Sequence, residues 1–291
     1  MPELPEVETI RLSLAKKIIG LSIKKIEILN PKTFQGDSQK VINQKILNVW
    51  RRGKGLGIDF ENGQTLLFHL KMSGQVIVTQ NETRKTQYEK RFVGGHPTKD
   101  MLAELPNKST RVVFYLSDGQ TMFFNDQRKF GWIKILDRQS LQLDKFLNNL
   151  GPEPLTKVYS WLHLKTNLLK HPKTVVKVGL LDQSVVAGVG NIYACEGCFN
   201  AGIDPRTKIT DLTDEQFKKL HQGVIQALQD GVKYGGSTKT HFVDSDGKKG
   251  LFLDYAKVYN RDKKPCMHCQ TPIKKIKLGG RGTFFCPQCQ M

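Results

Sequence analysis

The sequence has 291 residues, enough for about two domains of ordinary size with buried cores. A net charge of +18 indicates a polyanionic partner, and it favours nucleic acid over an anionic membrane surface. No run of about 18 apolar residues could span a bilayer, and the acidic N-terminus lacks the basic and apolar regions of a signal peptide. We therefore expect a cytosolic protein with no membrane partner.

The first eight residues, MPELPEVE, place a proline at position 2 and a carboxylate directly after it. Removal of Met1 would expose the secondary amine of Pro2, and an unperturbed terminal amine has a pKa of about 8. Such an amine can condense with an aldehyde-level carbon to give a cationic iminium, with Glu3 as a possible proton donor. Pro2 and Glu3 are therefore candidate catalytic residues. The alternative is that Pro5 begins a helix whose dipole the nearby carboxylates complement, and for Glu6 and Glu8 this second interpretation is favoured.

The next segments predict a helix followed by β-structure. Val7, Ile10, Leu14 and Ile18 recur at helical spacing before Gly20, which predicts an amphipathic helix over residues 5–19, and a strand is predicted over 23–29. Residues 58–70 and 112–124 repeat one pattern, in which Asn-Gly or Asp-Gly separates two apolar runs, so each predicts a hairpin. We expect the far ends of these hairpins to bring Met72, Arg128 and Phe130 to one region of a β-sandwich. The polar stretch 79–109 is predicted to be a long loop.

The second half of the chain predicts helices. Two prolines in residues 150–155 mark a change of domain, and helices are expected over 156–169, over 174–181 and from Asp214 onward. Thr213 and Gln216 form a capping box for the last of these, whose expected buried stripe is Phe217, Leu220, Val224, Leu228 and Val232. Gly188-Val189-Gly190-Asn191 leads into another short helix. Its backbone N–H groups could bind an anion, or it could be a tight turn between helices.

The six cysteines fall in three Cys-x-x-Cys pairs. Sixteen residues separate the last two pairs, Cys266 with Cys269 and Cys286 with Cys289, and this spacing is typical of a structural zinc site. Four thiolates would fill the zinc tetrahedron and leave no position for a catalytic water. Residues 257–291 hold eight lysines or arginines and one acid, which indicates an electrostatic contact surface. Cys195 and Cys198 have no second pair nearby, so core packing is favoured over a redox or metal role.

Seven segments along the whole chain together resemble one family, the bacterial formamidopyrimidine-DNA glycosylases of base-excision repair. The segments are MPELPEVETIR, RRGK at 51–54, HLKMSG at 69–74, RKFG at 128–131, LGPEPL at 150–155, VGNIYA at 189–194, and the final paired cysteines. The resemblance implies an α+β multidomain fold. Its parts would be a β-sandwich domain with a catalytic N-terminal helix (1–137), a linker (138–155), a helix-two-turn-helix domain with a base-capping loop (156–250) and a zinc hairpin (251–291). It also implies a monomer of the bacterial cytoplasm that binds damaged double-stranded DNA.

The resemblance implies the chemistry as well. Pro2 would attack C1′ of the damaged nucleoside while Glu3 protonates the opening sugar, and the resulting Schiff base would lead to β,δ-elimination and a strand nick. Lys54 and Arg281 complete the implied catalytic set, and the implied lesions are 8-oxoguanine and formamidopyrimidines. Three residues, Met72, Arg128 and Phe130, would fill the gap left by the extruded nucleotide. The other implied DNA contacts are His69, Lys129, Asn191, Tyr193, Thr238 and Arg281.

Taken singly, several of these residues have structural alternatives, namely core packing for Met72, Phe130 and His69 and a solvated basic loop for Lys54. The sequence also departs from the family pattern at Gly55, Gln127, Lys129, Gln183, Lys239 and His241. Gly55 replaces an aromatic residue, and Gln183 stands where Asn is common. The departures at Gly55, Gln127, Lys129 and Gln183 bear on the preferred opposite base more than on the reaction. Those at Lys239 and His241 bear on the contacts of the expected base-capping loop.

Two other functions stay open at this point. One is an endonuclease VIII-like glycosylase for oxidised pyrimidines, against which ELPEVE and the set of Met72, Arg128 and Phe130 argue. The other is a non-catalytic zinc DNA-binding protein, which would not need Pro2, Glu3 and Lys54.

Overall fold

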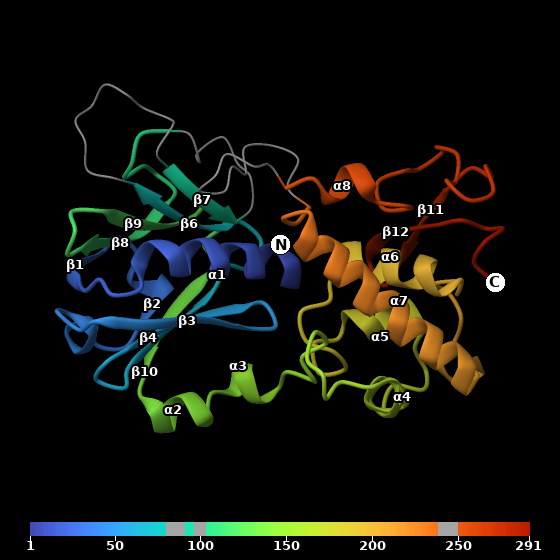
Figure 1. Cartoon of the computed structure of the whole chain (residues 1–291), viewed down its shortest axis with the longest axis horizontal. Coiled ribbons are helices and arrows are strands. Elements are labelled where there is room, and N and C mark those ends of the chain that lie inside the picture. The colour runs from blue at the N-terminus through green and yellow to red at the C-terminus, as the bar shows by residue number, and fades with distance from the viewer. Residues whose placement is uncertain (80–90, 96–102, 238–249) are drawn as a thin grey trace. The chain divides into compact units, whose positions relative to one another are not determined.

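The computed structural model describes residues 1–79, 91–95, 103–237 and 250–291, which form two compact units (Figure 1). The first unit contains Met1–Pro2 and Glu6–Asn148, and the second contains Glu3–Pro5, Asn149–Ser237 and Leu251–Met291. Helix α1 (Leu4–Ile18) therefore begins in the second unit and continues in the first.

Two five-stranded sheets make the first unit a β-sandwich, as the sequence predicted. One sheet has the strand order β1-β8-β9-β6-β7 and the other has the order β2-β10-β5-β4-β3. Within each sheet every pairing is antiparallel except that of β2 with β10. The strands are β1 (Ile23–Ile28), β2 (Phe34–Gln35), β3 (Ile46–Arg52), β4 (Gly55–Phe60), β5 (Thr65–His69), β6 (Gly74–Thr79), β7 (Arg91–Gly95), β8 (Thr110–Leu116), β9 (Thr121–Asp126) and β10 (Trp132–Leu136). Short 3₁₀ turns lie at Pro31–Thr33 and Ser38–Val41.

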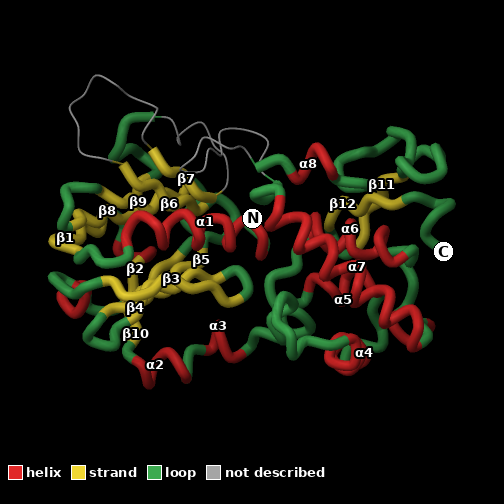
Figure 2. The backbone as a smooth tube through the Cα atoms, in the orientation of Figure 1, coloured by secondary structure: helices red, strands yellow, loops and turns green. Residues whose placement is uncertain are grey.

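Helix α1 supplies one wall of the sandwich core. Its four periodic apolar residues, Val7, Ile10, Leu14 and Ile18, are completely buried and pack in one cluster with residues of both sheets. Figure 2 shows the helix running alongside the strands of the two sheets. Burial of each such side chain contributes about 1.5–3 kcal/mol, so the stripe holds the helix, and with it the start of the chain, firmly in place.

A partly buried pair of salt bridges orients the same helix on its polar side. Glu8 accepts hydrogen bonds from Arg11 on the next turn and from Arg51 of β3, at 2.6 and 3.0 Å. Burial alone would raise the pKa of Glu8, but the two guanidinium groups lower it below its ordinary value. The helix-start interpretation of this carboxylate is thus too narrow, because Glu8 also fixes α1 against β3.

Both predicted hairpins are confirmed, as β4–β5 and β8–β9, and they lie in different sheets. Gly63 and Gly119 occupy the turns with φ of 79° and 85°, a conformation that favours glycine. The prediction of a loop over 79–109 is wrong for β7, which pairs with β6. Its Phe92 enters the main core and Val93 enters a small cluster on the opposite face, an alternation too short to stand out from the polar sequence around it.

The second unit is helical and ends in a two-stranded sheet, β11–β12. Among the described residues, no helix has the length and apolar character needed to cross a bilayer. The elements are α4 (Trp161–Leu169), α5 (Val176–Leu181), α6 (Asn191–Ala201), a 3₁₀ turn (Ile209–Asp211), α7 (Asp214–Lys233), α8 (Phe252–Tyr255), β11 (Lys274–Leu278) and β12 (Arg281–Phe285). Helix α4 starts later than the predicted Thr156, because residues 153–159 form turns and Ser160 is the N-cap.

Helix α7 follows its prediction. Thr213 and Gln216 form the capping box, and four of the five stripe residues are buried, while Val232 is partly buried. Two short helices, α2 (Arg138–Gln142) and α3 (Lys145–Asn148), lie in the segment predicted as linker. The four-part division of the chain stays a prediction.

Removal of the α7 cap should destabilise the helical unit. Thr213→Ala deletes the hydroxyl that accepts the Gln216 N–H, so we expect a loss of about 1 kcal/mol in urea unfolding followed by circular dichroism at 222 nm. Thr213→Ser keeps the acceptor and serves as the control. Equal stabilities for the Ala and Ser variants would show that the cap contributes nothing.

Candidate active site and nucleic-acid interface

The carboxylate of Glu3 is bound at the N-terminus of helix α6. It accepts hydrogen bonds from the backbone N–H groups of Ile192 and Tyr193, at 3.0 and 3.4 Å, and the Leu4 N–H donates to the Gly188 carbonyl at 3.0 Å. Free N–H groups at a helix N-terminus favour a negative charge. The side chain of Glu3 is therefore anchored to α6, and the main chain of Leu4 to the loop that precedes it.

The glycines before α6 make this approach possible. A Cβ on Gly190 would lie 2.3 Å from the Glu3 Cδ, and one on Gly188, whose φ is +86°, would lie 2.6 Å from the Leu4 Cβ. Gln183 holds the loop, since its amide donates to the Leu181 and Val189 carbonyls and accepts the Gly188 N–H. The helix N-terminus that follows the predicted anion-binding loop thus binds the chain's own carboxylate, through the N–H groups of Ile192 and Tyr193.

Asn191, the first residue of α6, links two other elements. Its Oδ1 accepts a hydrogen bond from Lys177 Nζ of α5 at 2.5 Å, and its Nδ2 donates to the Gly282 carbonyl of β12 at 2.9 Å. Lys177 is completely buried, and burial lowers its pKa below the ordinary value. The sequence analysis missed Lys177, although a lysine inside the apolar run VVKVGLL was a signal. Its contact fixes the Asn191 side chain, whose role at a DNA phosphate stays a prediction.

Pro2 and Lys54 are both buried, Lys54 with 5% of its surface exposed. In the chain as numbered, Met1 precedes Pro2, so the nitrogen of Pro2 is part of a peptide bond. Lys54 lies in the turn between β3 and β4, directly after Gly53, whose φ is +56°. The solvated-loop alternative for Lys54 is therefore wrong.

His69 ends β5 as a neutral ring. Its Nδ1 accepts the Lys71 N–H at 3.0 Å, so the ring proton resides on Nε2. Burial, with smaller effects from Lys71 and Lys54, lowers the pKa of His69 to about 3. His69 can therefore donate a hydrogen bond from Nε2 throughout the physiological pH range, without carrying charge.

The turns that hold Met72 and Arg128 are tied together by a buried carboxylate. Asp126 of β9 is completely buried, and it accepts hydrogen bonds from the Ser73 hydroxyl and from the Arg128 and Gly131 N–H groups, at 2.5, 3.2 and 2.6 Å. The Arg128 N–H also donates to the Ser73 Oγ at 3.0 Å. The sequence analysis missed Asp126, because a carboxylate at a strand end looks like an ordinary turn residue.

This connection presents an exposed apolar and basic group, as the sequence predicted for these three side chains. Met72 and Phe130 are 37% and 55% exposed, and the Arg128 guanidinium lies 5.0 Å from the centre of the Phe130 ring. Lys129 is exposed on the same turn with φ of 59°. The core-packing alternative for Met72 and Phe130 is therefore wrong.

Two of the implied DNA contacts, Tyr193 and Thr238, differ from the others. Tyr193 is completely buried, with its ring 4.9 Å from that of Phe252, so it is a core residue and the predicted DNA contact through its side chain is wrong. Thr238 lies outside the described residues, as do Lys239, His241 and most of the predicted base-capping loop.

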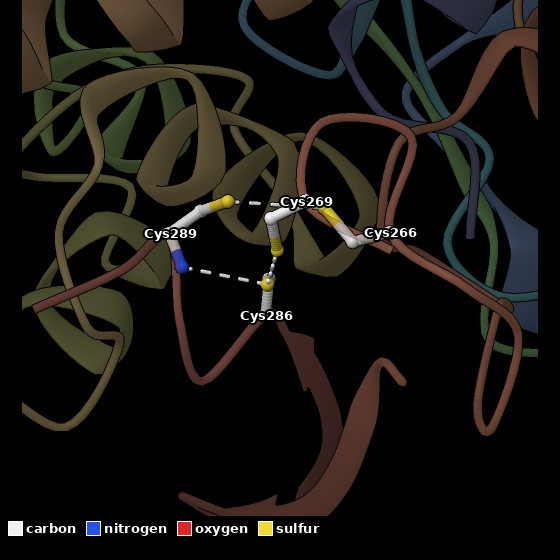
Figure 3. Close-up of side chains that lie close together, drawn as sticks. All are labelled: Cys266, Cys269, Cys286 and Cys289. Carbon is white, nitrogen blue, oxygen red and sulfur yellow. Dashed lines mark hydrogen bonds between the residues drawn. The ribbon is translucent and has the colours of Figure 1, made fainter. Parts of the chain in front are cut away.

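The final four cysteines form a metal site, shown in Figure 3. The sulfur atoms of Cys266, Cys269, Cys286 and Cys289 all lie within 4.8 Å of one another, and two of the pairs are 3.9 and 3.5 Å apart. A tetrahedral zinc with Zn–S bonds of about 2.3 Å would place its sulfurs roughly 3.8 Å apart. The four thiolates therefore fit one structural zinc ion.

The zinc hairpin is attached to α6 through a second buried carboxylate. Glu196 accepts the N–H groups of Lys257, Val258 and Tyr259 at 2.7–3.0 Å, and its burial raises its pKa. Arg281 at the start of β12 is exposed. Cys195 and Cys198 are completely buried, and burial raises the pKa of the Cys195 thiol to about 12, which agrees with their assignment as core residues.

Three domain families account for most of the chain. The Formamidopyrimidine-DNA glycosylase N-terminal domain matches residues 1–133, the Formamidopyrimidine-DNA glycosylase H2TH domain matches 150–243, and the zinc finger found in FPG and IleRS matches 263–290. The formamidopyrimidine-DNA glycosylases of Rickettsia bellii and Pelotomaculum thermopropionicum are 39% and 36% identical to this chain. Each comparison covers 100% of this chain and 99% of the relative. The chain belongs to the formamidopyrimidine-DNA glycosylase family.

Solved structures of the family have the same fold. The MutM (Fpg) protein of Thermus thermophilus is 33% identical with a TM-score of 0.83, over 99% of this chain and 98% of that one. A Lactococcus lactis Fpg in complex with Fapy-dG containing DNA is 29% identical with a TM-score of 0.83, over 99% of this chain and all of that one. The predicted family, fold class and single structural zinc are thus confirmed, and the endonuclease VIII-like alternative is not favoured.

Zinc removal should abolish DNA binding while the β-sandwich stays folded. The hairpin is too small to hold itself, so the bound ion supplies its folding free energy. We expect a chelator, or Cys266→Ser with Cys286→Ser, to eliminate DNA binding in fluorescence anisotropy. Met267→Ala, at an exposed position between two ligands, should bind normally. Tight binding by the double serine variant would contradict this.

Arg281 should contribute about one phosphate contact. The affinity of a protein for duplex DNA falls with salt at a slope of about −0.9 per neutralised phosphate. Arg281→Ala should therefore reduce the slope of log Kd against log salt by about one. Lys274→Ala removes an equal charge from the same hairpin and is the control. An unchanged slope in Arg281→Ala would mean that Arg281 faces solvent in the complex.

Proposed function

We propose that this family member is a bifunctional DNA glycosylase and AP lyase that removes oxidised purines, namely 8-oxoguanine and formamidopyrimidines, from double-stranded DNA. The observation that carries the proposal is the anchored carboxylate of Glu3, one residue from Pro2. A capping role at the start of α1 would not by itself bring Glu3 to another helix, yet the N–H groups of α6 bind its carboxylate. A non-catalytic DNA-binding protein has no use for this arrangement.

The chemistry begins with the amine that Met1 removal exposes on Pro2. The nitrogen lone pair attacks C1′ of the damaged nucleoside, the bond from C1′ to the base breaks, and the base leaves with the proton that the Pro2 nitrogen loses once the new bond has formed. Glu3 takes up the proton that the Pro2 ammonium must lose before the attack, and it donates this proton to the sugar ring oxygen as the ring opens, which yields a cationic Schiff base on Pro2. Successive eliminations then release the two flanking phosphates and leave a gap.

The exposed group of Met72, Arg128 and Phe130 supports the extrusion of the damaged nucleotide. Removal of a base from the stack requires a few kcal/mol, and apolar side chains inserted into the duplex offset part of this. The Arg128 guanidinium can donate hydrogen bonds to the orphaned base. The hydrogen bonds of Asp126 to both turns keep these side chains together before DNA arrives.

The backbone of the damaged strand would meet Lys54, His69, Asn191 and Arg281. Lys54 and Arg281 supply charge, and His69 supplies a neutral donor, so the set can bind several phosphates whose negative charges repel one another. The net charge of +18 agrees with this partner. A monomer in the bacterial cytoplasm remains the expectation for the whole protein.

Replacement of Glu3 by Gln should separate the two halves of the reaction. An abasic site already equilibrates with its open aldehyde and can meet the Pro2 amine directly, whereas an intact nucleotide needs a proton on the sugar. We expect Glu3→Gln to lose 8-oxoguanine excision by at least ~100-fold. Borohydride trapping and strand cleavage on abasic DNA should be retained.

Two further variants complete this experiment. Pro2→Ala leaves a primary amine and should weaken both reactions, and intact-mass analysis of each preparation establishes that Met1 has been removed. Glu6→Gln, at the next carboxylate along the chain, should excise 8-oxoguanine normally. Normal excision by Glu3→Gln would reduce Glu3 to an anchoring group and would move the search for the acid to Glu6.

A further inference from the structure

An aromatic side chain from α3 covers the strand ends that carry Lys54 and His69. Gly55 of β4, His69 of β5 and Trp132 of β10 are register partners, so they form one row across three adjacent strands. The Phe146 ring lies 5.0 Å from His69 and 5.3 Å from Trp132 between ring centres, edge-on to both. The aromatic ring that packs against His69 is thus that of Phe146, which lies in a segment predicted from the sequence to be a linker.

Gly55 leaves the space that this ring fills. A Cβ at position 55 would lie only 2.7 Å from the Phe146 Cε1. No side chain can therefore occupy this position while Phe146 stays where it is. The aromatic residue expected after Lys54 is absent from the strand, and an aromatic ring reaches the same place from about ninety residues later in the chain.

Helix α3 has only four residues, so contacts outside it must hold Phe146. Asp144 accepts the N–H groups of Phe146 and Leu147 at 3.0 and 3.2 Å, and its other oxygen binds Lys134 Nζ of β10 at 2.7 Å. The same Nζ lies 4.6 Å from the centre of the Trp132 ring. This set of contacts fixes the position of Phe146 relative to the sheet.

The ring that Phe146 covers is suited to binding an anion. His69 Nε2 carries the proton and has no hydrogen-bond partner among the residues that the structure describes, although His69 is only 6% exposed. The charged groups nearby are Lys54 before β4, Lys71 after β5, and Lys134 of β10, the last paired with Asp144. Their positive charge would attract a phosphate oxygen to this donor.

We infer that Phe146 is a positioning residue, which holds the His69 ring in one orientation and one tautomer as a hydrogen-bond donor to a DNA phosphate. The inference rests on the proposed function for the identity of the phosphate, but the packing of His69 can be tested without DNA. Without Phe146 the ring gains water on one face. It then rotates more freely and can take up a second proton.

The first test is a titration of His69 in the free protein. In the wild type, the ¹³C-labelled His69 Cε1–H resonance should stay unchanged between about pH 5 and 8, because the neutral form is favoured by burial. In Phe146→Ala the pKa should rise toward the ordinary value of about 6.5, so the resonance should titrate. The spectrum of His69→Gln assigns the signal. A flat His69 resonance in Phe146→Ala would overturn the inference.

The second test measures binding to duplex DNA that contains a stable abasic-site analogue. Loss of one hydrogen bond to a charged oxygen should raise the Kd of Phe146→Ala about 10-fold at pH 8. The deficit should shrink at about pH 6, where the newly titrating His69 becomes cationic, and this pH effect should vanish when His69→Gln is added. An unchanged Kd, or a deficit that stays constant with pH, would contradict the inference.

Controls separate positioning from stability. Phe146→Leu keeps most of the volume and should show the same changes in weaker form, which covers the case in which the Ala variant does not fold. Phe114→Leu makes a similar loss in the sandwich core, beside Phe68, and should lower the unfolding free energy while leaving His69 neutral.

Gly55→Ala tests the contact between position 55 and Phe146. It should weaken DNA binding in the wild-type background but have little effect when added to Phe146→Ala, because its Cβ then meets no ring. Failure of wild-type borohydride trapping would defeat the proposed function while leaving the titration result intact.

Discussion

The hydrogen bonds between the Glu3 carboxylate and the first N–H groups of α6 are the constraint on which the proposed active site depends. They bind a charged group from the start of the chain to a helix that begins at residue 191. The partial positive charge of a helix N-terminus favours this partner, and the absence of a side chain at Gly190 lets it approach. This one contact therefore sets both the position of the Glu3 carboxylate and its electrostatic surroundings.

Other contacts around α6 reinforce that arrangement. Lys177 and Gly282 hold Asn191 from two sides, and Glu196 attaches the segment before the zinc hairpin to the same helix. In the β-sandwich, Asp126 plays a similar part for the turns of Ser73 and Arg128. In each case a buried polar group is hydrogen-bonded to another element and so fixes a side chain or a backbone segment in place. Buried groups of this kind are stable only when they are satisfied, so they define one geometry strongly.

Local sequence patterns predicted much of this fold. Helical periodicity predicted α1 and α7, and Asn-Gly and Asp-Gly predicted two hairpins, because these signals depend on neighbouring residues alone. The spacing of the four cysteines predicted the zinc site for the same reason. Strand β7 and the start of α4 were not predicted correctly, since each depends on packing or on turns whose sequence is unremarkable.

The residues of the candidate site could be predicted mainly through the family resemblance. The buried residues that hold them in place could not be predicted from the sequence. Nothing near Lys177 in the sequence indicates that Asn191 is its partner, and nothing near Gly55 indicates that Phe146 fills the space above it. The burial of Tyr193 could not be predicted either, because the segment VGNIYA does not indicate whether its tyrosine faces DNA or the core. Such contacts join residues far apart in the chain, and a single sequence contains no record of the pairing.

The anchoring of residues 3 and 4 makes the proposed chemistry depend on how the N-terminus of the chain is processed. Leu4 is hydrogen-bonded to Gly188 and Glu3 to α6, so the Cα atom of residue 2 lies one peptide unit, about 3.8 Å, from a residue held by these bonds. Any residue left ahead of Pro2 converts the amine into an amide, and no rearrangement of the fold can restore the lone pair. An affinity tag at this end would therefore block the proposed Pro2 nucleophile unless a protease cleaved the tag directly before the proline. At the opposite end Met291 is 86% exposed, so an extension there meets no such restriction.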